Sequence, residues 1–161
     1  MNSPATHPEE SCVIRLNGRL ADVFPLFGPL REREWAEGWN PRVVWPDTGA
    51  IQERMTFLTG HAQDHDDASL WVVSRYDPDQ ARIEYTVYSA NRVRWILICC
   101  RESEGGNATE AEITYTYVGA SESARTRNAR DLESMFKHRL KDWEHAINHY
   151  LRTGDRLTHH H

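Results

Sequence analysis

The chain has 161 residues and a formal net charge of −5, which suits one globular domain with a substantial core. The acidic balance and the scattered basic residues argue against a nucleic-acid binder. No apolar run approaches the roughly 18 residues that a membrane-spanning helix needs. The polar N-terminus carries Pro4 and Pro8 and lacks the apolar core of a secretion signal, so we expect a cytoplasmic protein.

The first forty residues predict one strand and two short helices. The short apolar run 12–16 ends at a turn signal and favours a strand. The range 20–27 has apolar residues at helical spacing, but Pro25 makes that helix short or broken. A second short helix can occupy 29–35. Trp39 then lies in a turn between glycine and proline.

From residue 42 onward the hydrophobic period changes to two, which predicts six consecutive strands. Apolar residues alternate with polar ones, and turn-forming residues separate the segments. Consecutive strands joined by short turns form an antiparallel meander. The expected strands are 42–45, 51–57, 70–76, 82–87, 92–99 and 111–117.

The range 121–154 holds the only long run with helical periodicity. Its apolar positions recur at spacings of three and four and therefore share one face. Ser121 can cap the helix and Gly154 can end it, so the helix should run from about 122 to 152. The apolar face holds Leu132, Phe136, Leu140, Trp143, Ile147 and Leu151, and the face expected to be solvated holds Arg130, Glu133, Lys137, Lys141, Glu144 and Asn148.

These elements predict an α+β fold of two layers, because the sheet has one apolar face to cover and the helix has one to bury. We expect a curved antiparallel sheet of seven strands around the long C-terminal helix, with two short helices between the first two strands. The domain should span 11–153. Residues 1–10 should form a flexible N-terminus, and residues 154–161 a tail whose last histidines look like a purification tag.

The element order resembles the helix-grip fold of the START, Bet v 1 and polyketide cyclase-like (SRPBCC) superfamily. The likeness is greatest to bacterial members described as polyketide cyclase/dehydrase-like. The resemblance implies the fold but no single activity, because members include lipid carriers, hormone receptors, cyclases and chaperone cofactors. It rests on Phe24-Pro25-Leu26-Phe27 with Trp35 and Gly38-Trp39-Asn40-Pro41, on Gly60-His61 with Trp71-Val72-Val73-Ser74-Arg75-Tyr76-Asp77, and on Thr114-Tyr115-Thr116-Tyr117 with Trp143-Glu144.

The inward residues and the resemblance together predict a cavity between the sheet and the long helix. Ligand pockets are mostly apolar with a few placed polar groups, and buried phenols need hydrogen-bond partners. The alternative is a filled core without a pocket. The residues expected to bind a ligand are Met55, Phe57, Tyr85, Val87, Trp95, Leu97, Ile113, Tyr115, Tyr117, Phe136, Leu140 and Trp143, with Trp39 at the mouth.

Three polar residues are candidates for catalysis. Glu53 falls on the apolar side of a predicted strand, where burial would raise its pKa toward that of a general base. Arg75, if it faces inward, could pair with Glu53 or bind an acidic ligand. Tyr115 could steer a proton transfer. The alternative places Glu53 in a solvated pair at the rim of the sheet.

No residue cluster has clear metal-binding or cofactor-binding spacing. His61 and His65 stand beside three aspartates in the range 61–67, but a turn between strands gives their spacing no common face, and we favour a solvated loop. Cys12 and the adjacent pair 99–100 indicate small buried residues rather than metal ligands. We expect no metal and no cofactor.

Three functions compete. The favoured one is the binding of a small apolar or aromatic molecule, and the second is an enzyme of the aromatase/cyclase type. The third is an interaction module like the chaperone-activating branch of the superfamily. For that third function, Ile96, Ile98 and Val118 on the outer face could form a partner surface or a homodimer.

Overall fold

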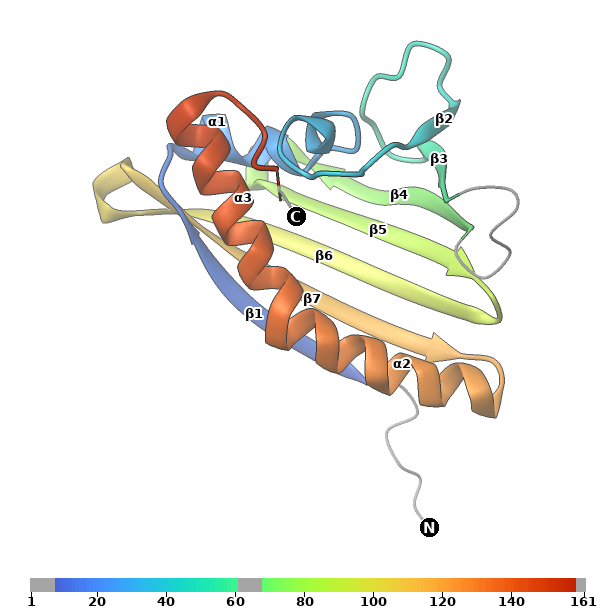
Figure 1. Cartoon of the computed structure of the whole chain (residues 1–161). Coiled ribbons are helices and arrows are strands. Elements are labelled where there is room, and N and C mark those ends of the chain that lie inside the picture. The colour runs from blue at the N-terminus through green and yellow to red at the C-terminus, as the bar shows by residue number, and fades with distance from the viewer. Residues whose placement is uncertain (1–7, 61–67, 159–161) are drawn as a thin grey trace.

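A computed structural model gives the structure of the chain and describes residues 8–60 and 68–158. A seven-stranded antiparallel sheet and a long C-terminal helix form its two layers (Figure 1). The predicted helix-grip α+β fold is confirmed. The strands are β1 (Glu9–Leu16), β2 (Arg42–Trp45), β3 (Thr56–Thr59), β4 (Ser69–Asp77), β5 (Arg82–Ser89), β6 (Arg92–Ser103) and β7 (Ala108–Gly119).

The strand order in the sheet is β1-β7-β6-β5-β4-β3-β2. The strands from β2 to β7 are neighbours in chain order, as in a meander, and β1 pairs with β7 at the edge. The first strand starts at Glu9, two residues before the predicted boundary of the domain. The predicted strand 51–57 begins later than expected. The chain makes a turn at residues 53–54, with Arg54 at a φ of 74°, before β3 begins at Thr56.

The segment between β1 and β2 contains short helical turns, as Pro25 predicts. It comprises α1 (Leu20–Val23) and two 3₁₀ turns at Phe24–Phe27 and Arg31–Glu34. The Trp35 indole N–H donates to the carbonyl of Leu26 at 2.8 Å, and Trp35 is 1% exposed. This tryptophan therefore fixes the segment in place. Figure 1 shows the segment between β1 and β2 lying at one end of the sheet.

The C-terminal helix is continuous but not uniform. It consists of α2 (Glu122–Ser134), a π-helical turn at Met135–Arg139, and α3 (Leu140–Thr153). The predicted ends are confirmed: the hydroxyl of Ser121 accepts a bond from a backbone N–H at 3.1 Å, and Gly154 adopts a φ of 77°. A π turn inserts one residue into the helical repeat, and such turns occur frequently at functional sites.

Two residues expected on the solvated face of this helix instead bind the edge of the sheet. Glu144 accepts the backbone N–H of Arg15 at 2.7 Å, and Asn148 accepts that of Asn17 at 2.7 Å. The side-chain amide of Asn148 also donates to the carbonyl of Arg15 at 3.1 Å. The polar residues of α3 thus satisfy backbone groups that β1 would otherwise present to water.

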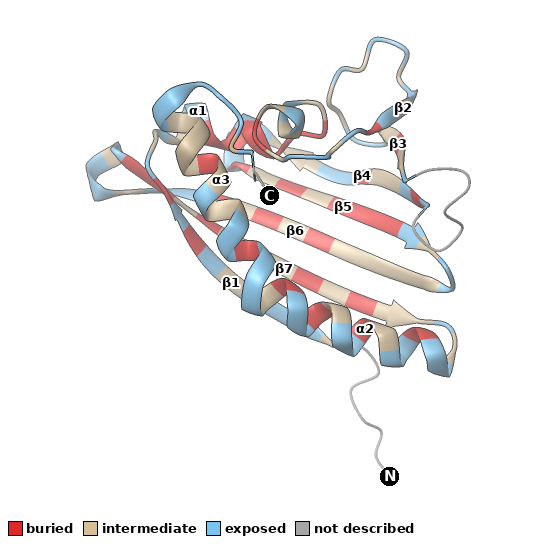
Figure 2. Cartoon of the chain, in the orientation of Figure 1, coloured by how far each residue is buried: buried red, intermediate tan, exposed pale blue. Residues whose placement is uncertain are grey.

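The predicted facing of β6 is reversed. Residues directly opposite each other on neighbouring strands share a face of the sheet, and Ile96 lies opposite both Tyr85 and Tyr115. Ile96 is accordingly buried on the concave face, while Trp95 and Leu97 point to the other side and are half-buried. Figure 2 shows buried and half-buried positions alternating along parts of β6 and β7.

Candidate functional site

A cavity of about 470 Å³ lies between the concave face of the sheet, the segment that follows α1, and the C-terminal helix. Most of its wall is apolar or aromatic, and a few charged groups interrupt it, which is the composition of a ligand pocket. The lining residues are Glu32, Trp35, Ala36, Glu37, Gly38, Trp39, Trp71, Tyr85, Arg94, Ile96, Ile98, Tyr115, Met135, Arg139, Asp142, Trp143, Ala146 and Leu157.

Three aromatic rings form one rigid wall of the cavity. Trp71 on β4 meets Trp39 edge to face at 5.4 Å between ring centroids, and meets Tyr85 edge to face at 5.6 Å. The Trp39 indole N–H donates to the carbonyl of Pro29 at 2.7 Å, which fixes the ring in place. Offset and edge-to-face pairs at these separations are the favoured aromatic geometries. The wall therefore offers a preformed surface for a planar ligand.

Glu32 places a carboxyl group in this aromatic surrounding. Its side chain is half-buried, and within the described ranges it has no hydrogen bond or ion pair. Burial raises the pKa of Glu32 well above its ordinary value of 4.5. Burial also raises the pKa of the Tyr85 phenol, and the charge of Glu32 adds to that shift. The cavity therefore contains a carboxyl group that holds its proton more strongly than a solvated glutamate does.

The Glu32→Gln variant should be more stable than the wild type at neutral and alkaline pH, and equally stable near pH 4. Below the ordinary pKa both the folded and unfolded chains carry a protonated Glu32, so burial adds no ionisation cost. As the pH rises toward the raised folded-state pKa, the unfolded chain ionises first and wild-type stability falls. Melting temperatures measured from pH 4 to pH 9 test this. A difference that does not change with pH contradicts it.

The two tyrosines that line the cavity have different surroundings. The Tyr85 hydroxyl donates to the carbonyl of Phe27 at 2.6 Å. Among the described residues, the Tyr115 hydroxyl has no hydrogen-bond partner. Burial is the larger cause that raises the pKa of Tyr115, and the neighbouring Tyr117 adds to the rise. Tyr115 also contacts the ring of Phe136 edge to face at 6.0 Å between centroids. The neutral hydroxyl of Tyr115 is therefore free to bind a ligand from the floor of the cavity.

The residues that were predicted to contact a ligand divide into three groups. Trp39, Tyr85, Tyr115 and Trp143 line the cavity. Trp95 and Leu97 lie on the opposite face of the sheet, so their predicted inward facing is wrong and they do not line the cavity. The others belong to the core around the cavity or pack against it: Met55, Phe57, Val87, Ile113, Tyr117, Phe136 and Leu140.

Glu53 and Arg75 do not line the cavity, contrary to the predicted inward position of Glu53, and their catalytic roles stay untested predictions. Glu53 is exposed in a turn, where it accepts the backbone N–H of Tyr76 at 3.3 Å. Arg75 is exposed on β4 opposite Glu84, just after the register shifts beyond Val73. That irregularity breaks the alternation of faces along β4, and no period-two pattern could have placed the arginine.

Several lining residues were missed by the sequence analysis. Glu32 lies in the run Arg31–Glu34, which looks like a solvated helical turn, and no local signal places it over the sheet. Arg94 could have been found, because it shares a face with Ile96 once β6 is paired with its neighbours. Leu157 lines the cavity from residues 154–161, which were predicted to form a tail outside the domain.

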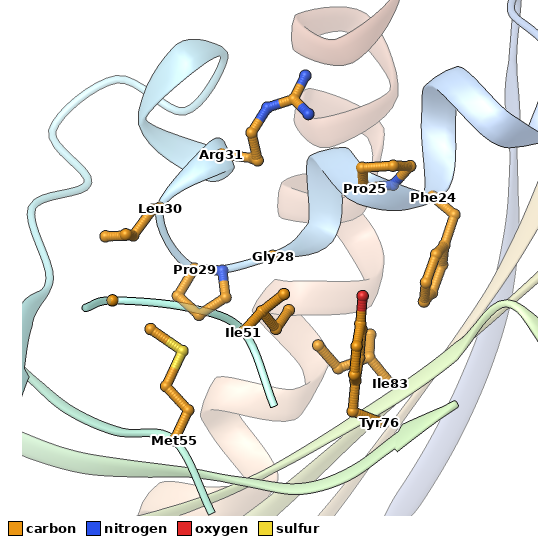
Figure 3. Close-up of a pocket in the computed structure, with 11 residues that line it drawn as sticks. Phe24, Pro25, Gly28, Pro29, Leu30, Arg31, Ile51, Met55, Tyr76 and Ile83 are labelled. Carbon is orange, nitrogen blue, oxygen red and sulfur yellow. The ribbon is translucent and has the colours of Figure 1, made fainter. Parts of the chain in front are cut away.

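A second, smaller cavity of about 260 Å³ lies beside the Phe24–Phe27 turn. Figure 3 shows side chains of the connecting segment, of the stretch before β3 and of β4 and β5 around it, with the guanidinium of Arg31 directed away from the ring of Tyr76. Phe24 stacks on Tyr76 at 6.2 Å between centroids, and Arg31 pairs with Glu34 at 2.7 Å. This cavity is apolar and offers little to orient a ligand. The larger cavity is therefore the better candidate site.

The histidine and aspartate cluster at 61–67 lies outside the described residues. Within residues 8–60 and 68–158, no three histidine, cysteine, aspartate or glutamate side chains are grouped as a metal site would require. Over the same ranges, no helix is both long enough and apolar enough to cross a membrane.

No protein-family model matches the sequence, and no curated protein does. Solved structures do match. Norcoclaurine synthase from Thalictrum flavum, as a point mutant in complex with a transition-state analogue, gives a TM-score of 0.68 at 7% identity, covering 95% of this chain and 99% of that one. A START superfamily protein from Mycobacterium smegmatis gives 0.62 at 8% identity, with 88% and 97% covered. An uncharacterised protein from Rhizobium leguminosarum gives 0.59 at 19% identity, with 89% and 97% covered. At these identities the likeness establishes the fold alone, which agrees with the predicted helix-grip fold.

Proposed function

We propose, on the premise that the chain has the helix-grip fold of the START and Bet v 1 superfamily, that it binds a small apolar or aromatic molecule between the sheet and the C-terminal helix. The observation that carries this proposal is the aromatic wall of Trp39, Trp71 and Tyr85 around a space of about 470 Å³. Ligand pockets commonly enclose roughly 300–1,000 Å³. The fold typically accommodates hydrophobic ligands, which agrees with this wall.

Filling the cavity should abolish binding. Ala146 lines the cavity from α3, so the Ala146→Trp variant should lower the affinity for the neutral fluorescent probe N-phenylnaphthylamine at least about tenfold, which corresponds to roughly 1.4 kcal/mol of lost contact. Fluorescence titration measures the affinity, and circular dichroism checks the fold.

The matched control is His145→Trp, because His145 is the adjacent residue of α3 and is exposed. The control should bind the probe as the wild type does. If the wild type binds neither this probe nor any member of a panel of lipids and aromatic polyketides, the proposed function fails. The same conclusion follows if Ala146→Trp binds unchanged.

A second candidate function is enzymatic, and the carboxyl of Glu32, which faces the cavity and whose pKa is raised by burial, supports it. A carboxylic acid held neutral near pH 7 can act as a general acid or donate a hydrogen bond to a developing oxyanion. Turnover of aromatic polyketide substrates should then fall in Glu32→Gln while binding of the neutral probe persists. Turnover that is unchanged in this variant removes the acid role.

The interaction-module hypothesis loses two of its three residues. Ile96 and Ile98 are buried on the concave face, and of the predicted surface only Val118, on the other face, remains. A homodimer stays a prediction, and light scattering on the eluting protein at high concentration tests it.

A further inference from the structure

We propose that Arg94 is the counter-ion site of the cavity and that the ligand is an aromatic anion, bearing a carboxylate, sulfonate or similar group. This inference rests on the proposed function, because it names the ligand class for the same cavity. It starts from one difference between two arginines on the concave face of β6.

Arg94 extends over the floor of the cavity. It lies opposite Val87 on one side and Tyr117 on the other, and its guanidinium carbon is 5.7 Å from the ring centroid of Trp71. Its Nη2 donates to the hydroxyl of Ser69 at 3.5 Å, the long limit of a hydrogen bond. Its Nε is buried and has no hydrogen-bond partner among the described residues. The guanidinium also forms a side-chain hydrogen bond with the Tyr117 hydroxyl, and the Nε of Arg92 is unpartnered in the same way. The donors of Arg94 are therefore only partly used, and none of these partners is an anion.

Arg92, two residues earlier on the same face, has the partners that Arg94 lacks. Its Nη1 lies 2.6 Å from the carboxylate of Asp131 and 3.2 Å from the side-chain oxygen of Asn128, both on α2. No described aspartate or glutamate forms such a pair with Arg94. A partly buried cation without a counter-ion is costly, and a bound anion would remove that cost.

The other charged groups at the cavity do not supply this anion. Glu32 faces the cavity from the Arg31–Glu34 turn, and burial raises its pKa well above the ordinary value, which disfavours the charged form of the carboxyl. Arg139 and Asp142 line the cavity from the helix, and Glu37 lines it from the segment after the Arg31–Glu34 turn. All three are exposed, so solvent screens them. The interior is therefore electropositive at Arg94.

The same arrangement favours a ligand with an aromatic body. The face of Trp71 lies beneath the guanidinium, and the Tyr115 hydroxyl shares the floor. A planar ligand can rest on the aromatic wall while its anionic group accepts two N–H bonds from the fork, which is the geometry in which arginine binds carboxylates most strongly.

Two probes that share one ring system and differ by a single anionic group test the proposal. Anilinonaphthalene sulfonate carries the anionic group, and N-phenylnaphthylamine has the same ring system without it. The wild type should bind the sulfonate roughly 10- to 100-fold more tightly, as expected for hydrogen bonds to a charged group. The Arg94→Met variant should lose this preference and keep its affinity for the neutral probe. The control, Arg101→Met, removes an exposed arginine of the same strand and should behave as the wild type.

The outcomes separate this inference from the proposed function. If the wild type binds the neutral probe but shows no preference for the sulfonate, or if Arg94→Met weakens both probes equally, the anion site is refuted and the binding function stands. If the wild type binds neither probe nor any of the panel above, both fail. Should Arg94→Met not fold, Arg94→Lys replaces it. This variant keeps the charge without the planar fork, so it should show an intermediate preference, and an unaltered preference contradicts the role of the fork.

Discussion

Replacing Trp35 with alanine should lower the free energy of unfolding by about 3–5 kcal/mol, the usual cost of removing a buried tryptophan. The side chain is 1% exposed, and its ring meets Phe27 at 6.3 Å and Trp143 at 5.9 Å between centroids. The variant also leaves the Leu26 carbonyl without its donor, which adds an unsatisfied buried group. Chemical denaturation measures the loss.

The control for this prediction is Trp45→Ala. Trp45 lies on β2 and is 47% exposed, so the expected change is within about 0.5 kcal/mol. A Trp35→Phe variant should fall between the two, because it keeps most of the ring contacts and loses the hydrogen bond. Equal stability of the Trp35→Ala and Trp45→Ala variants would show that Trp35 does not join the connecting segment to the helix.

Replacing Leu140 with alanine should cost about 2–5 kcal/mol, as large-to-small changes in a core do. Leu140 is 1% exposed and is the first residue of α3 after the π-helical turn. It belongs to the core but does not line the larger cavity. The affinity for the neutral probe should therefore stay within about twofold, roughly 0.4 kcal/mol.

The adjacent Lys141 provides the matched control, because it is exposed on the same turn of the helix. Lys141→Ala should be nearly neutral in denaturation. If Leu140→Ala retains wild-type stability, the helix does not depend on this contact. If it stays folded and loses the probe, Leu140 contributes to the cavity after all.

The fold could be predicted because its strongest signals are local. The capping residues Ser121 and Gly154 delimit a run with one apolar face, and both operate as expected. The meander follows from turns between period-two segments. Pro25 shortens the connecting helix as proline must. These features depend on residues close together in the chain, so a single sequence carries them.

The site could be predicted only in part because its residues come together over long distances. On β6 both faces are apolar, so the pattern could not decide between Trp95 and Ile96, and only pairing with β5 and β7 does. Glu53 was misplaced because the strand starts after it. Glu32 reaches the cavity because Trp35 and the Tyr85 hydroxyl hold its segment down, and nothing near Glu32 in the sequence encodes that.

The hydrogen bonds from Glu144 and Asn148 to β1 have a consequence for how copies of this chain can meet. An exposed edge strand is a template onto which another molecule can add a strand. At the end of β1, the backbone N–H groups of Arg15 and of Asn17, which directly follows the strand, already donate to Glu144 and Asn148. The opposite edge, β2, is only four residues long. Growth of the sheet from one molecule to the next is therefore disfavoured at both ends, and an assembly of this chain would join through its faces.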